Sequence, residues 1–90
     1  MTLSERIARL RDIEERNLAH ALAETADLIE RACRDARSGD WKSAMLVHGL
    51  YVRFAVLNAR ALERERSRSF RSLRRDIAER VVRVLTGKEG

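Results

Sequence analysis

The spacing of apolar and polar residues along the chain predicts three α-helices. Apolar residues recur every three or four positions, with no proline and only four glycines, which is typical of a nearly all-helical chain. The predicted helices span about 3–37, 41–64 and 69–85. We therefore expect an all-α fold in one domain over 1–90: a long helical hairpin with a third amphipathic helix that completes a three-helix bundle.

Residues typical of helix ends mark the limits of these segments. Thr2 followed by Glu5 is a capping-box pattern, so the first helix is expected to begin at about Leu3. Ser38-Gly39-Asp40 supplies a glycine for a left-handed helix end and an aspartate that caps the second helix. Thr86-Gly87 closes the third helix in the same way.

The junction near residues 65–69 is predicted to be a turn, although it contains neither glycine nor proline. Two apolar stripes on either side of it are displaced by roughly 150° around the helix axis. They consist of Val47, Leu50, Phe54, Leu57 and Ala61, and of Phe70, Leu73, Ile77, Val81 and Val84. Ser67 or Ser69 can cap a new helix here. The alternative is one unbroken helix, which would expose one stripe in a monomer and so require a partner chain.

The predicted second helix is apolar on nearly all sides. Only Lys42, Arg53 and Arg60 form a narrow polar strip along it. We therefore expect this helix to be central, with neighbours on at least two sides. Gly49 costs about 1 kcal/mol of helix stability relative to alanine, and the close approach of a neighbouring backbone would compensate for it.

The first predicted helix is longer than the second, and the difference predicts self-association. At 1.5 Å per residue the two helices span roughly 50 and 36 Å, so about ten N-terminal residues have no neighbour in the same chain. Leu3, Ile7 and Leu10 recur in this overhang at coiled-coil spacing. We expect a homodimer or larger homo-oligomer that associates through these three residues. A solvated, fraying helix end is the alternative.

The net charge of +5 comes from one stretch of the chain. Residues 1–59 carry nine basic and nine acidic side chains, whereas 60–83 carry nine arginines and four acidic side chains. Such a basic patch attracts acidic partners. In a continuing helical register its candidate partner-binding residues line one face, and they are Arg60, Arg64, Arg68, Arg71 and Arg75. A solvated face with ion pairs one turn apart, such as Arg75 with Glu79, is the alternative.

No residue pattern predicts catalysis, a metal site or a cofactor. His20 and His48 have no second ligand at metal-binding spacing, and Cys33 has no recognisable histidine partner. We expect Cys33 to be buried and Trp41 to cover the end of the hairpin. The N-terminus is charged where a signal peptide is apolar, and no apolar run approaches the roughly 20 residues of a membrane span. We therefore expect a cytoplasmic protein that is not an enzyme.

The stretch SGDWKSAMLVHGLYVRFAVLNARALERE, residues 38–65, resembles the core of phasins, the helical proteins that coat bacterial polyhydroxyalkanoate granules. The likeness consists of a short turn, a polar residue and then an apolar helix. The centre of that helix holds Tyr51, Arg53 and Phe54, and its end, residues 58–62, is rich in alanine. The resemblance covers about a third of the chain. It implies adsorption to an apolar granule or membrane surface.

These observations lead to one functional hypothesis and two alternatives. We expect a non-enzymatic, self-associating helical module that binds an acidic protein surface through its arginine-rich face. The first alternative is the phasin-like adsorption just described. The second is nucleic-acid binding through the basic patch. Since the sequence shows no helix-turn-helix signature, such binding would be directed mostly at phosphates.

Overall fold

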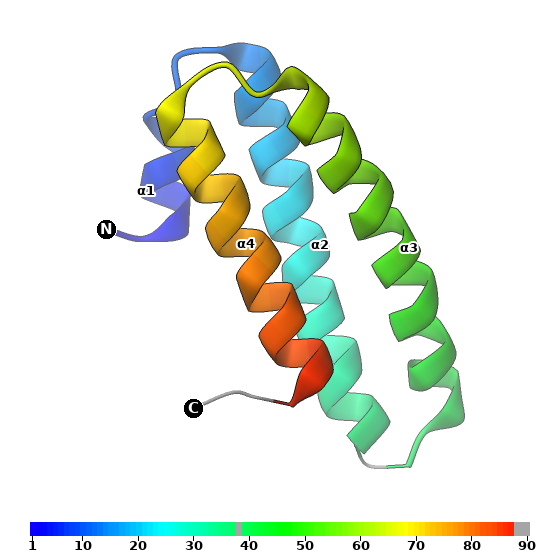
Figure 1. Ribbon diagram of the computed structural model, residues 1–90. Helices are drawn as coiled ribbons and strands as arrows, with labels where there is room; N and C mark the ends of the chain where they lie inside the picture. The colour runs from blue at the N-terminus through cyan, green and yellow to red at the C-terminus, as the bar shows by residue number, and fades with distance from the viewer. Residues whose placement is uncertain (38, 88–90) are drawn as a thin grey trace.

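The computed structural model describes residues 1–37 and 39–87, and these residues form four helices and no strand. In chain order the helices are α1 (Leu3–Ala8), α2 (Ile13–Arg37), α3 (Trp41–Arg64) and α4 (Arg68–Thr86). The all-α prediction is confirmed for this part of the chain, but the number of helices is four and not three. α2 lies in the middle, with α3 on one side and α4 and α1 on the other (Figure 1).

The predicted first helix is broken between α1 and α2. Asp12 caps α2, because its Oδ1 accepts a hydrogen bond from the backbone N–H of Glu14 at 2.9 Å. The Arg16 guanidinium donates to the carbonyl oxygen of Leu10, with Nε at 3.2 Å, and so ties the connection after α1 to the first turn of α2. The prediction of one continuous helix over 3–37 is therefore wrong, because a capping aspartate lies inside it.

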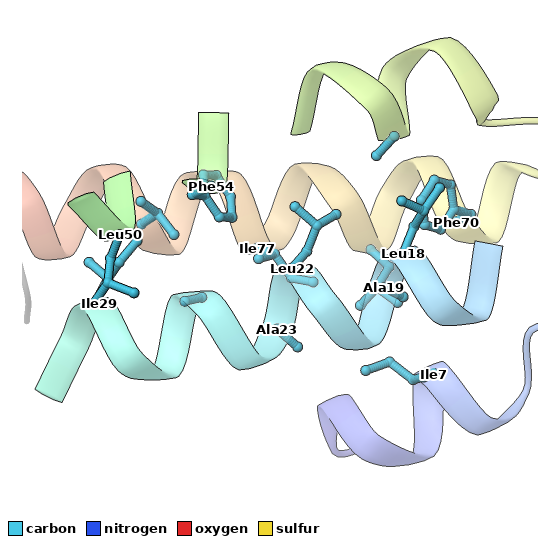
Figure 2. Packing of buried hydrophobic residues seen from close by; sticks show 14 of the residues in the cluster. Ile7, Leu18, Ala19, Leu22, Ala23, Ile29, Leu50, Phe54, Phe70 and Ile77 are labelled. Carbon is cyan, nitrogen blue, oxygen red and sulfur yellow. The ribbon is translucent and has the colours of Figure 1, made fainter. Parts of the chain in front are cut away.

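The break folds α1 back along the bundle, so the chain has no N-terminal overhang. Ile7 and Leu10 are buried in the core, and Leu3 packs half-buried against it. Figure 2 shows Ile7 facing Ala19 and Ala23 of α2. Folding back removes these side chains from water, which a projecting helix cannot do within one chain. The expectation that this segment lacks neighbours is wrong, and self-association through Leu3, Ile7 and Leu10 loses its structural basis.

The connection between α2 and α3 is a short turn with a glycine and a capping aspartate. Gly39 has φ of 94°, a left-handed conformation that favours glycine. Asp40 caps α3, because its Oδ1 accepts from the backbone N–H of Lys42 at 3.0 Å and its Oδ2 accepts from the hydroxyl of Ser43 at 2.9 Å. Ser38, which belongs to the predicted turn, lies outside the described residues.

The connection between α3 and α4 is held from the inside by a buried carboxylate. Ser67 caps α4, because its hydroxyl accepts from the backbone N–H of Phe70 at 3.1 Å. Glu15 of α2 is only 2% exposed, and its Oε2 accepts from the backbone N–H groups of Arg66 at 2.9 Å and Ser67 at 3.1 Å. A buried charge requires such partners, so Glu15 fixes the turn over the start of α2. α3 and α4 are thus two helices and not one rod.

The core lies mainly between α2 and α4. Its largest fully buried apolar side chains are Leu22, Ile29, Phe70, Leu73 and Ile77. α3 adds Leu50 and Phe54 from the side that faces α2 (Figure 2). The prediction that the second long helix is central is therefore wrong. Because α1, α3 and α4 all pack on α2, α2 takes the central place, and α3, which also contacts α4, lies at one edge.

Candidate interaction surfaces

The structure divides the five predicted partner-binding arginines between two helices. Arg60 and Arg64 belong to α3, whereas Arg68, Arg71 and Arg75 belong to α4. The turn between the helices interrupts the register that would have aligned all five. The single row of five arginines is therefore not formed, and each group has its own surroundings.

The two α3 arginines line a groove of about 610 Å³ between α2 and α3. Much of the rest of its lining is apolar and includes Ile13 and Leu57. Arg64 Nη1 lies 3.0 Å from Glu14 Oε1, so this arginine is already in an ion pair. Arg60 is exposed beside the pair. The groove therefore offers a mixed apolar and basic lining and not a concentrated positive charge.

The three α4 arginines lie on the outer side of that helix, and we define them as the α4 arginine surface: Arg68, Arg71 and Arg75. All three are exposed. Arg71 Nε is 3.3 Å from Glu65 Oε1. Arg68 and Arg75 have no acidic partner within the described residues. The spacing of three and four residues places the three side chains on one face, as the sequence indicated.

A second groove, of about 430 Å³, adds an arginine from α1 to this surface. Arg9 and Arg68 both line it, together with Ser69 and Ser72. The neighbouring Arg6 is tied to α4, because its Nη1 lies 2.8 Å from Asp76 Oδ2. Arg9, by contrast, has no acidic partner in the part of the chain that the structure describes. The α4 arginine surface therefore continues across the groove to Arg9.

Arg74 is used inside the chain. Its Nε lies 2.7 Å from Glu65 Oε2, and its Nη1 donates to Asn58 Oδ1 at 3.3 Å. The hydrogen bond from Arg74, with the positive charges of Arg74 and Arg71, holds the pKa of Glu65 below its ordinary value. Because Arg74 is buried, it joins the end of α3 to α4 and is not available to a partner.

Arg80, nearer the C-terminal end of α4, also forms ion pairs within the chain. Its Nη2 lies 2.8 Å from Asp27 Oδ1 and also donates to Glu30, so it connects α4 to α2. The hydrogen bond from Arg80, helped by its charge and that of Arg34, lowers the pKa of Glu30. Some of the excess arginines in the sequence, such as Arg74 and Arg80, therefore form ion pairs that hold the helices together.

Several apolar side chains are exposed on the side of α3 that points away from α2. We define the α3 outer face by residues that recur there at alternating spacings of four and three, namely Met45, Gly49, Val52, Val56 and Ala59. Met45, Val52 and Val56 are 65%, 48% and 55% exposed. Exposed apolar patches of this kind mark interaction sites in soluble proteins.

Trp41 precedes the α3 outer face by one turn and is 66% exposed. The expectation that it covers the end of the hairpin is therefore wrong. Lys42 places its Nζ 5.9 Å from the centre of the indole ring, but no core residue covers the ring. Trp41 therefore adds to the apolar surface of α3.

The residues considered for chemistry are not gathered at one place. His20 and His48 are exposed, and Cys33 is half-buried against the core. Among the described residues, no three metal-ligating side chains cluster together. Over the same residues, no helix has the length and apolar character needed to cross a membrane.

Arg9 and Glu15 were missed as candidates from the sequence. Arg9 is far from α4 along the chain, and only the fold brings it beside Arg68. Glu15 had a signal, because Asp12 and Glu15 repeat the capping spacing of Thr2 and Glu5. In the structure, however, Glu15 turns to the α3–α4 connection.

No protein-family model matches this chain, and neither the curated proteins nor the solved structures include a significant match to it.

Proposed function

We propose that this chain is a non-enzymatic helical interaction module, which self-associates and binds an acidic protein segment through the α4 arginine surface and Arg9. Binding through the arginines is supported by a difference between arginines that form ion pairs within the chain and arginines that do not. Arg9, Arg68 and Arg75 are exposed without an acidic partner in the described chain, whereas the neighbouring Arg6, Arg66 and Arg74 are in ion pairs. Positive charge without a local partner attracts acidic groups on other molecules.

The size of this surface favours a short acidic segment over a nucleic acid. Arg68 to Arg75 spans roughly 10 Å of helix at 1.5 Å per residue. The exposed Asp76 and Glu79 follow directly on α4. Duplex DNA carries a negative charge about every 1.7 Å along its axis, so its phosphates would continue onto these two carboxylates. A short acidic peptide, by contrast, can end before it meets them.

Binding of this kind is expected to be weak and sensitive to salt. The arginines are exposed, and charges at a protein surface are screened beyond about 10 Å at 0.1 M salt. Individual exposed ion pairs contribute about 0–1 kcal/mol each. Several arginines must therefore act together, which is what their spacing on one face allows.

A triple substitution tests this function. Arg68→Gln, Arg71→Gln and Arg75→Gln together should reduce binding to a polyglutamate peptide at low salt. The matched control replaces Arg31, Arg34 and Arg53 by glutamine, which removes the same charge from exposed positions on α2 and α3. Equal loss in both triple variants would mean that only net charge matters and would contradict a specific surface. Tighter binding to duplex DNA than to polyglutamate would favour the phosphate-directed alternative.

Adsorption to an apolar granule or membrane surface is a second candidate function. The α3 outer face is apolar and exposed, and Lys42, Arg53 and Arg60 flank it. This combination is typical of helices that lie in a membrane interface. The stretch that resembles phasins also contains α3. Adsorption of this kind should depend on Val52 and Val56 and should change little with salt or with the α4 arginine surface.

A further inference from the structure

We propose that the α3 outer face binds the same face of a second copy of this chain, antiparallel, about a two-fold axis near Val52. This inference specifies the self-association within the proposed function and does not depend on the arginine surface. α3 forms one edge of the molecule, and none of the other described helices lies on its outer side (Figure 1).

The surface area of the chain matches what such a pair requires. Its accessible surface is 6164 Å². A compact monomer of 10.4 kDa is expected to expose roughly 5,400 Å². The excess of roughly 800 Å² is about what each partner buries in a stable protein interface. The chain therefore exposes enough surface for one further helix neighbour.

Gly49 provides an independent indication of a neighbouring helix. Glycine in the middle of a helix lowers its stability, so a compensating close approach of another backbone is expected. A Cβ placed on Gly49 would meet nothing within 4 Å. The chain itself therefore makes no use of the missing side chain. Gly49 belongs to the α3 outer face, where a second helix would approach.

The residue spacing on this face fits a paired helix. Alternating steps of four and three are the seam of two helices that wrap around each other. In an antiparallel pair centred on Val52, Met45 lies level with Ala59 of the second copy. Gly49 lies within one residue of Val56 of the second copy. On either side of the axis, where Val52 meets Val52, a large side chain then faces a small one, which favours close packing.

A parallel pair would fit less well. It would place Met45 against Met45 and Gly49 against Gly49, so the seam would be crowded at one level and empty at the next. It would also align Lys42 with the Lys42 of the second copy. The antiparallel pair instead places Lys42 within one residue of Glu63 of the second copy, which gives opposite charges at both ends of the interface.

The mass in solution tests the pairing. Sedimentation equilibrium of the full chain should give twice 10.4 kDa. Val52→Asp should raise the dimer dissociation constant by more than roughly 100-fold, because it buries an unpaired charge at the axis. Val82→Asp is the matched control, since Val82 is 58% exposed on α4 and should leave the mass unchanged. Circular dichroism should show native helix content in both variants, because both valines are exposed in the single chain.

Two outcomes would overturn this inference. One is a monomeric mass for the native chain at the highest soluble concentration. The other is an equal effect of the two aspartate variants on the mass. A monomer that instead adsorbs to neutral lipid vesicles, and loses adsorption with Val52→Asp, would assign the α3 outer face to an apolar surface. Polyglutamate binding by Val52→Asp remains a separate readout, so failure of the pairing and failure of the arginine surface are distinguishable.

Cysteine cross-linking tests the antiparallel direction. In a Cys33→Ser background, the chain with both Met45→Cys and Ala59→Cys should form a disulfide-linked dimer on oxidation. The chain with Met45→Cys alone should not, because the two Met45 positions lie at opposite ends of the interface. Rapid cross-linking of the single variant would overturn the antiparallel arrangement.

Gly49→Ala tests the close approach of the two backbones. The added methyl group has space in the single chain, so the helix content should be retained or increased. In the pair it would crowd the seam and raise the dissociation constant by roughly tenfold. An unchanged or lower dissociation constant would contradict a close approach at Gly49.

Discussion

α4 and α3 are both rich in apolar residues, but the chain covers them very differently. On α4 the apolar stripe is buried, and Phe70, Leu73 and Ile77 are at most 2% exposed. On α3 only the side facing α2 is buried, while Val52 and Val56 remain about half exposed. The two helices therefore differ in how many of their apolar sides find a neighbour within the chain.

The difference shows what an apolar pattern determines. α4 has one apolar face and a charged outer face, so one neighbour is enough to satisfy it. α3 has apolar residues on opposite sides, and it requires two neighbours. The chain covers only the inner side of α3, which packs on α2 and also contacts α4. The pattern thus predicts how many neighbours a helix needs, but it does not predict whether they belong to the same chain.

The largest expected effect comes from removing a core side chain of α4. Ile77→Ala should lower the free energy of unfolding by about 2–5 kcal/mol, because Ile77 is buried and its loss leaves a cavity. Val82→Ala, on the exposed side of the same helix, should change it by less than about 0.5 kcal/mol. Urea unfolding followed by circular dichroism measures both. Similar losses for the two variants would contradict the assignment of a buried and an exposed side to α4.

A smaller effect is expected at the turn that separates α3 from α4. Glu15→Ala leaves the backbone N–H groups of Arg66 and Ser67 without their buried acceptor and should cost about 1–3 kcal/mol. Glu24→Ala on the exposed side of α2 is the control and should be nearly neutral. Thermal unfolding compares the two variants. If Glu15→Ala is as stable as the control, the turn does not depend on this carboxylate.

The smallest expected effect is the acid sensitivity of the ion pair between Glu65 and Arg74. The pKa of Glu65 is lowered in the folded chain, so the ionised carboxylate stabilises the fold above its unfolded pKa. This contribution is lost as the pH falls from about 5 through the lowered pKa. Glu65→Gln should therefore lower stability at pH 7 and flatten the decline of stability on acidification. The measurement is the thermal midpoint of both chains from pH 7 to pH 3. An unchanged slope in Glu65→Gln would contradict this role.

Helix ends and the phase of apolar residues were the most predictable features of this fold. Asp40 and Gly87 act at the places where their residue types indicated an end. The displaced stripes predicted the turn near Ser67, because a straight helix cannot direct two faces to one core. These features depend on neighbours in the sequence, so the sequence alone was sufficient.

Features that depend on distant contacts were not predictable in the same way. The apolar residues keep their helical spacing from α1 into α2. This spacing therefore did not show that the helix is interrupted and that Asp12 caps a new one. The grouping of Arg9 with Arg68 requires α1 to fold back on α4. The internal use of Arg74 and Arg80 depends on acidic residues from other helices or from the turn between them. Counting charges along the sequence therefore overestimated the number of arginines that are available to a partner.

The most direct test of the central claim uses Trp41, the single tryptophan, at the start of the exposed side of α3. Acrylamide quenching of its fluorescence should be measured over a dilution series of the native chain. If a second copy covers this side, Trp41 should be protected at high concentration and become more accessible on dilution, and Val52→Asp should be accessible throughout. A Trp41 that is fully accessible at every concentration of the native chain would contradict the account.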